Sequence, residues 1–64
     1  MTIAEKLVEL RKKSGKTQAE VSEALNISQS RLGNYETGIR VPRDEMKSKI
    51  AAYYGLTVQE IFFN

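Results

Sequence analysis

The 64-residue chain is long enough for one small hydrophobic core and too short for two, so we expect a single domain over residues 1–64. It contains neither cysteine nor histidine, which excludes disulfides and thiolate metal sites and removes the usual general base. We therefore expect no enzyme activity, no cofactor and no metal. Ten basic and eight acidic residues give a net charge of +2, which permits nucleic-acid binding without requiring it.

We expect neither a membrane-spanning segment nor an export signal in this chain. No apolar run approaches the roughly 18 residues of a membrane span, and residues 1–6 lack the charged-then-apolar layout of a signal peptide. We expect a cytoplasmic protein with no membrane partner.

Three Thr-x-x-Glu capping boxes predict helix starts, at Thr2, Thr17 and Thr57. The first helix carries an apolar stripe of Ile3, Leu7 and Leu10, and Gly15 supplies a left-handed stop.

The second helix is expected to bury Val21, Ala24 and Leu25 and to end at Asn26, which tolerates a left-handed conformation. Ser28 can then cap a third helix that ends at Gly38.

A fourth helix is predicted to start at Pro42, with Asp44 and Glu45 in a first turn where the helix dipole favours anions. It stops at Gly55, and the capping box at Thr57 opens a last short helix. No segment alternates apolar and polar residues long enough for a strand, so the sequence predicts an all-α fold of five helices.

The third helix has one polar face. At about 100° per residue, Leu32 and Tyr35 point inward, while the opposite side carries Ser30, Asn34 and Thr37, flanked by Gly33, Gln29 and Arg31. Amides can pair with adenine, and a guanidinium can pair with guanine or phosphate. This face therefore suits the reading of a nucleic acid.

From Gln18 to Thr37 the chain resembles the helix-turn-helix of phage repressors and Cro proteins, the Xre-type group. The similarity includes Val21, Leu25, Ile27, Leu32 and Tyr35, the Glu36-x-Gly38 ending, and the closing I-A-x-Y-Y-G-L-T-V-Q-E-I-F pattern. Ser22 stands where alanine is usual and Asn26 where glycine is usual, and both replacements are physically mild. The resemblance implies a compact, five-helix, lambda-repressor-like domain with its helix-turn-helix at about residues 18–37.

The resemblance also implies roles for individual residues. Positions that touch base edges in the family correspond to Gln29, Ser30 and Asn34, with Arg31 beside them able to reach a base or a phosphate. Gln18 corresponds to a glutamine that holds a phosphate at a helix N-terminus. The remaining phosphate contacts are expected at Lys16, Thr37, Arg40 and Arg43.

An ion pair between Arg11 and Glu36 is predicted to tie the first helix to the end of the third. Both residues lie at the edges of apolar stripes, and in related proteins an arginine and a glutamate pair at these positions.

The C-terminal quarter holds four of the five aromatic residues, more than a small core readily encloses. Phe62 and Phe63 are adjacent and cannot both face inward on a helix. We expect a homodimer, with Tyr54, Phe62 and Phe63 as candidates for its interface.

Together these features favour a sequence-specific transcriptional regulator, a repressor, that binds a double-stranded DNA operator within the nucleoid and takes no small-molecule ligand. The alternative is a helical protein-interaction module of the antitoxin or coactivator kind. The polar outer face of the third helix favours DNA, because a protein partner would select aromatic and aliphatic anchors there.

Overall fold

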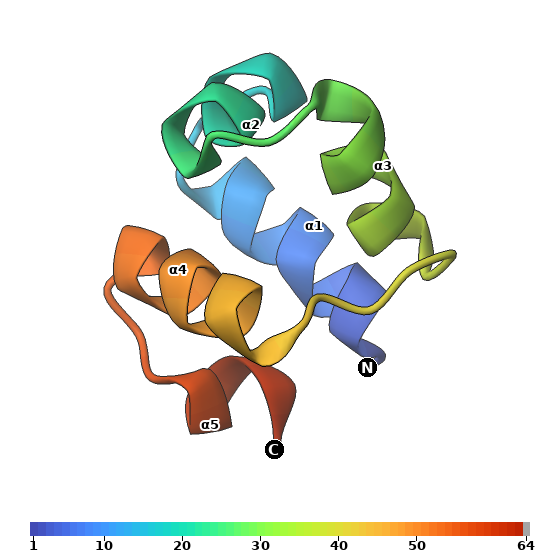
Figure 1. Ribbon diagram of the computed structural model, residues 1–64. Coiled ribbons are helices and arrows are strands. Elements are labelled where there is room, and N and C mark those ends of the chain that lie inside the picture. The colour runs from blue at the N-terminus through green and yellow to red at the C-terminus, as the bar shows by residue number, and fades with distance from the viewer. Residues whose placement is uncertain (64) are drawn as a thin grey trace.

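The computed structural model describes residues 1–63, and within them the chain folds into five α-helices without a strand. Figure 1 shows α1 running through the middle, with α2 and α3 on one side and α4 and α5 on the other. The all-α expectation is confirmed. The helices are α1 (Ile3–Lys13), α2 (Gln18–Leu25), α3 (Gln29–Thr37), α4 (Asp44–Tyr54) and α5 (Val58–Phe62).

The three predicted capping boxes are present. In each, the threonine Oγ1 accepts a hydrogen bond of 3.1 Å from the glutamate amide, and the glutamate Oε1 accepts one from the threonine amide. The bond from the cap-residue amide is the main reason why the pKa of each glutamate lies below its ordinary value. The pairs are Thr2 with Glu5, Thr17 with Glu20, and Thr57 with Glu60.

The turn between α2 and α3 closes on Asn26, whose φ of 59° is the only positive value at a non-glycine residue in the described chain. The Ile27 amide donates to the Ser22 carbonyl at 2.9 Å, the pattern of a left-handed helix end. Ile27 then packs against the core, so the angle between the two helices is held from both sides.

Two predicted helix details are wrong. Helix α4 begins at Asp44 and not at Pro42, because the backbone of its N-cap Arg43 is extended, and Pro42 is buried in the preceding connection. Ala24 is exposed and Ser22 is buried, since the inward arc of α2 is centred between Val21 and Ser22. The Ser22 hydroxyl donates to the Ala19 carbonyl at 3.1 Å, so the burial leaves no unpaired polar atom on that side chain.

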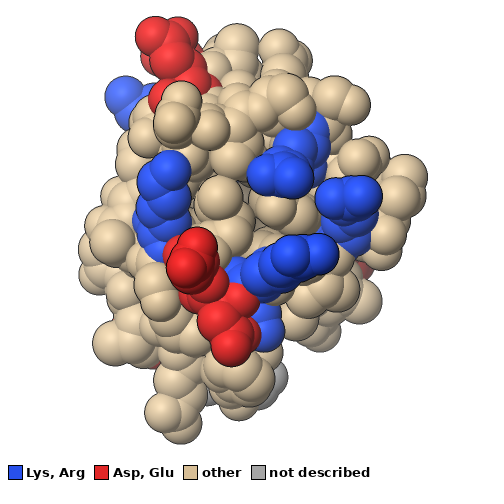
Figure 2. All heavy atoms as spheres, in the orientation of Figure 1, with Lys and Arg blue, Asp and Glu red and all other residues tan. Residues whose placement is uncertain are grey.

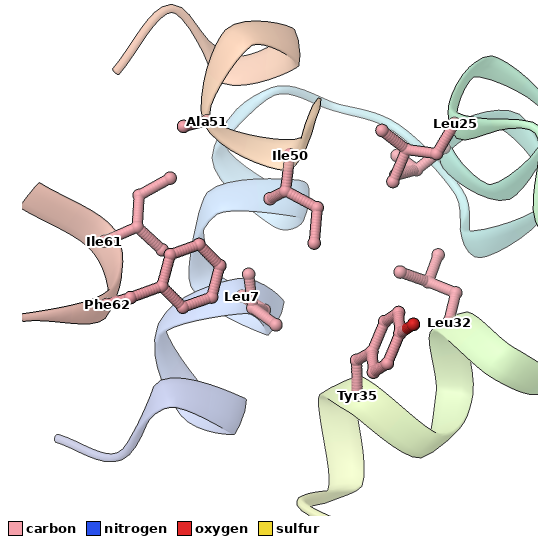
Figure 3. Packing of buried hydrophobic residues seen from close by; sticks show 9 residues of the cluster. Leu7, Leu25, Leu32, Tyr35, Ile50, Ala51, Ile61 and Phe62 are labelled. Atoms are coloured by element: carbon pink, nitrogen blue, oxygen red, sulfur yellow. The ribbon is translucent and has the colours of Figure 1, made fainter. Parts of the chain in front are cut away.

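The hydrophobic core draws on every helix (Figure 3). Leu7 of α1 lies between Ile50 of α4 and Phe62 of α5, while Leu32 and Tyr35 approach from α3. Its members are Leu7, Val21, Leu25, Leu32, Tyr35, Ile50, Ala51, Ile61 and Phe62. The inner face of α3 is therefore fixed to the rest of the domain.

The three aromatic residues expected at a dimer interface differ in exposure. Phe62 is 7% exposed and belongs to the core, so its side chain is not available to a second copy, and this part of the prediction is wrong. Phe63 is 65% exposed and Tyr54 is partly buried. The two adjacent phenylalanines therefore differ in exposure, although Lys47 Nζ lies close to both rings, 5.6 Å from the centroid of Phe62 and 4.9 Å from that of Phe63.

Candidate nucleic-acid interface

Helix α3 turns its polar residues away from the core. The Ser28 Oγ caps the helix by accepting a hydrogen bond of 3.0 Å from the Arg31 amide, while Leu32, Tyr35 and Glu36 are buried. Gln29, Ser30 and Arg31 are consequently exposed, and Asn34 is partly buried. The residues expected to read bases thus lie on the outward side of a helix whose inner side is held by the core.

A buried network connects three helices at the end of α3. Arg11 Nε of α1 lies 2.8 Å from Glu36 Oε2, and the Glu36 side chain is only 3% exposed. Arg11 Nη1 also donates to the Lys16 carbonyl at 3.1 Å. The ion pair expected from the sequence is present, and it fixes α1 and the α1–α2 turn relative to α3.

Gln18 joins this network at the first position of α2. Its Nε2 donates to Glu36 Oε1 at 2.9 Å, which sets the orientation of the carboxamide. Backbone amides in the first turn of a helix have no intrahelical partner and favour anions. The start of α2 therefore offers an oriented amide group and a positive helix end beside α3, although the sequence had not indicated the bond to Glu36.

The hydroxyl of Thr37, where a phosphate contact was expected, already donates to carbonyl groups within α3. Its hydroxyl donates to the Gly33 carbonyl at 2.9 Å and lies 3.4 Å from the Asn34 carbonyl. A hydroxyl has one hydrogen to donate, so Thr37 would have to give up these bonds before it could donate to a phosphate.

Three of the four arginines lie around a hollow between α3, the 38–43 connection and the start of α4. Figure 2 shows blue side chains around this hollow, and a close group of acidic side chains beside it. The depression has a volume of about 270 Å³, and three arginines contribute to its walls. Its lining comprises Arg31, Tyr35, Arg40, Val41, Arg43, Glu45 and Met46.

The structure groups the basic residues differently from the sequence. Lys16 lies apart from Arg40 and Arg43, in a shallow depression that it shares with Glu20, Glu23 and Tyr53. Conversely, Arg31, expected beside the base readers with either a base or a phosphate within reach, joins Arg40 and Arg43 at one hollow. Helical spacing predicts that Arg31 lies on one flank of α3. It does not predict that the 38–43 connection brings Arg40 and Arg43 to the same flank.

Within residues 1–63 there is no group of acidic side chains arranged to hold a metal ion. Over the same residues, none of the helices is long and apolar enough to cross a membrane.

Helices α2 and α3 are short and are joined by a tight turn. The inner face of α3 packs on the core and its outer face is polar, which defines a helix-turn-helix domain. Residues 7–61 match the family described as "Helix-turn-helix". The chain belongs to this family, in its Cro/C1-type form, whose members are DNA-binding domains.

Two known proteins are similar to this chain over most of its length. It is 37% identical over 57 residues to the HTH-type transcriptional regulator ImmR of Bacillus subtilis (strain 168), covering 89% of this chain and 45% of ImmR. It also resembles the crystal structure of a transcriptional regulator from Listeria innocua, with a TM-score of 0.90, 27% identity, and coverage of 98% of this chain and 59% of that chain. The chain spans about half the length of these relatives.

Proposed function

We propose that this chain acts as a sequence-specific transcriptional regulator, a repressor. It binds double-stranded DNA with α3 in the major groove, where Gln29, Ser30 and Asn34 face base edges. The observation that carries the proposal is the two-sided character of α3, because a buried inner face holds a polar outer face in a fixed position. Both relatives are described as transcriptional regulators, which supports the same function.

The proposal includes a homodimer acting on the nucleoid in the cytoplasm. Two copies can read two half-sites about 34 Å apart on one face of the duplex. Phe63, 65% exposed at the end of α5, is the side chain best placed to meet a second copy. We assign no catalytic activity and no small-molecule ligand, since the chain has no histidine or cysteine from which the common catalytic arrangements are built.

Selection of bound sequences from a random duplex pool tests the proposal directly. We expect enrichment of a palindromic consensus, which would demonstrate sequence reading and two-fold symmetry together. A variant with Asn34→Ala should lose preference at one base pair of each half-site. Absence of any enriched sequence with the folded wild-type chain would refute the proposed function.

One observation favours a second candidate, a protein-interaction module. Ile39 is 74% exposed and Val41 is 61% exposed, and both lie on the α3–α4 connection. Exposed apolar side chains are common at protein interfaces. They lie outside α3, however, and its outer face has no aromatic or aliphatic anchor, so DNA remains the better partner for that face.

A further inference from the structure

The hollow beside α3 concentrates positive charge. Arg31 comes from α3, Arg40 from the connection and Arg43 from the N-cap position of α4, so three segments bring one guanidinium each. Glu45 is the only acidic residue in the lining. The resulting excess of two positive charges is as large as the formal net charge of the whole chain.

These arginines are not used to hold the fold together. Over residues 1–63, their side chains take part in no hydrogen bond or ion pair, although the Arg40 amide donates to the Asn34 carbonyl at 3.1 Å. Arg11 is the contrasting case, because its guanidinium is paired with Glu36 and its side chain is only 15% exposed. Three exposed guanidinium groups around one concavity repel one another, and an anion from outside the chain would relieve that repulsion.

The position of Arg31 on α3 separates it from the base readers. Arg31 and Gln29 lie on opposite flanks of the helix, and the flank of Gln29 is also that of Glu36, which bonds Gln18. One flank therefore faces the start of α2, and the other faces the arginine hollow. Only the arc between them, with Ser30 and Asn34, points directly outward.

We infer that Arg31, together with Arg40 and Arg43, binds a backbone phosphate of the DNA duplex and does not read a base. The inference rests on the proposed function and decides between the two contacts first expected for Arg31, a base or a phosphate. Guanidinium groups form bidentate hydrogen bonds with phosphate oxygens, and such contacts position a protein without carrying sequence information. The start of α2 and the arginine hollow then contact the backbone on the two sides of α3.

The test compares Arg31→Ala with Asn34→Ala on the selected operator and on each of its single-base-pair variants, at several salt concentrations. We expect Arg31→Ala to weaken binding by the same factor on every sequence and to make the log–log salt slope shallower by about one unit. Arg43→Ala should do the same. Asn34→Ala should lose discrimination at one base pair and keep the wild-type slope.

The contrary result is equally distinct. If Arg31→Ala abolishes the preference for one base pair while the salt slope stays at its wild-type value, Arg31 reads a base and the inference is wrong. Arg31→Lys keeps the positive charge and removes the guanidinium group. If this variant keeps the wild-type salt slope and the wild-type base preferences, the result supports a phosphate contact. Circular dichroism melting of each variant checks that the fold is kept.

Two further arms separate this inference from its alternatives. Titration of the chain with inorganic pyrophosphate, without DNA, should show no binding tighter than about 1 mM; tighter binding that Arg31→Ala removes would assign the hollow to a free phosphate instead.

If the wild-type chain binds no DNA sequence in the selection experiment, the proposed function fails and the role of Arg31 fails with it. A base-reading Arg31, in contrast, would leave the proposed function intact.

Discussion

Glu36 lies on α3 and accepts hydrogen bonds from Arg11 of α1 and Gln18 of α2. Its side chain is 3% exposed, so its carboxylate has lost nearly all of its water. Burial of a charge is tolerated only when partners replace that water, and here a guanidinium and an amide do so. The packing of three helices therefore depends on one carboxylate.

Glu36→Gln should destabilise the domain strongly. The substitution removes the charge from one partner and leaves the Arg11 guanidinium largely buried without its counterion, and the breaking of such pairs typically costs about 3 to 5 kcal/mol. Urea unfolding of the two proteins measures the difference. Glu9→Gln is the matched control, because the Glu9–Lys13 pair is exposed and worth less than about 1 kcal/mol. An unchanged free energy of unfolding for Glu36→Gln would show that the ion pair contributes nothing to stability.

Gly33→Ala should stabilise the domain. Gly33 lies within α3 without a positive φ, and a Cβ added there meets no atom within 4 Å. Alanine is favoured over glycine in a helix interior by about 1 kcal/mol, so we expect a higher midpoint of thermal unfolding. Gly38→Ala is the opposite control, since its φ of +83° strains any L-residue and should lower the midpoint. A lower midpoint for Gly33→Ala would reveal a structural need for glycine that the geometry does not show.

At the scale of single elements, the capping boxes connect helix stability to pH. The pKa values of Glu5, Glu20 and Glu60 are lowered, first by the hydrogen bond from the cap-residue amide and second by the threonine hydroxyl. A lowered pKa in the folded state means that the contribution to stability is complete above the ordinary glutamate pKa. That contribution is lost as the pH falls through the folded-state pKa.

The carboxyl resonances of these glutamates, followed by NMR against pH, should titrate below the ordinary pKa of a glutamate side chain. Thr17→Ala removes the cap hydroxyl and frays the first turn of α2, so the pKa of Glu20 should rise toward its ordinary value. The pKa values of Glu5 and Glu60 serve as internal references in the same spectra. If Glu20 titrates at the same pH in both proteins, the capping box does not control its ionisation.

The helix ends were predictable from the sequence because they are decided locally. A Thr-x-x-Glu pattern or a glycine at a helix end acts through neighbours three or four residues away, and residues such as Thr17 and Gly38 behave as expected. The burial of Pro42 and Ser22 depends on elements distant in sequence, so periodicity alone placed the start of α4 and the inner arc of α2 wrongly.

The same distinction applies to the candidate site. The outward face of α3 follows from helical geometry, and Gln29, Ser30 and Asn34 are where the spacing put them. The bond from Gln18 to Glu36 and the meeting of Arg31 with the 38–43 connection require the relative placement of separate segments. Sequence reasoning therefore found the outward polar face of α3 but not the contacts on its two flanks.

At the scale of the whole molecule, Phe63 is an apolar side chain that the described residues leave mostly uncovered. It is 65% exposed, and Lys47 Nζ lies 4.9 Å from its ring centroid. Phe62 beside it is enclosed in the core, and Tyr54 is partly buried, with its pKa raised to about 12 chiefly by burial. A second copy that packed on α5 would cover Phe63 without disturbing the core.

Phe63→Ser should weaken self-association and leave the stability of the single copy almost unchanged, because the lost side chain contributes little to the core. Sedimentation equilibrium over a range of protein concentrations measures this, and a loss of at least about tenfold in the association constant is expected for an aromatic residue at an interface. Ile39→Ser is the control, since Ile39 is 74% exposed on the α3–α4 connection and lies outside α5. A single 7.3 kDa species at high micromolar concentration, with and without operator DNA, would rule out the dimer.

The proposed dimer would also set the spacing of the operator. Two copies related by a two-fold axis place their α3 helices about one turn of duplex apart, so insertion of about five base pairs between the half-sites moves one of them to the opposite face. The wild-type chain should then lose the cooperative gain between half-sites while its affinity for one isolated half-site stays the same. Phe63→Ser should respond much less to the insertion than the wild-type chain, because its dimer contact is already weakened. If the lengthened operator binds the wild-type chain as tightly as the original, the half-sites are read by independent copies.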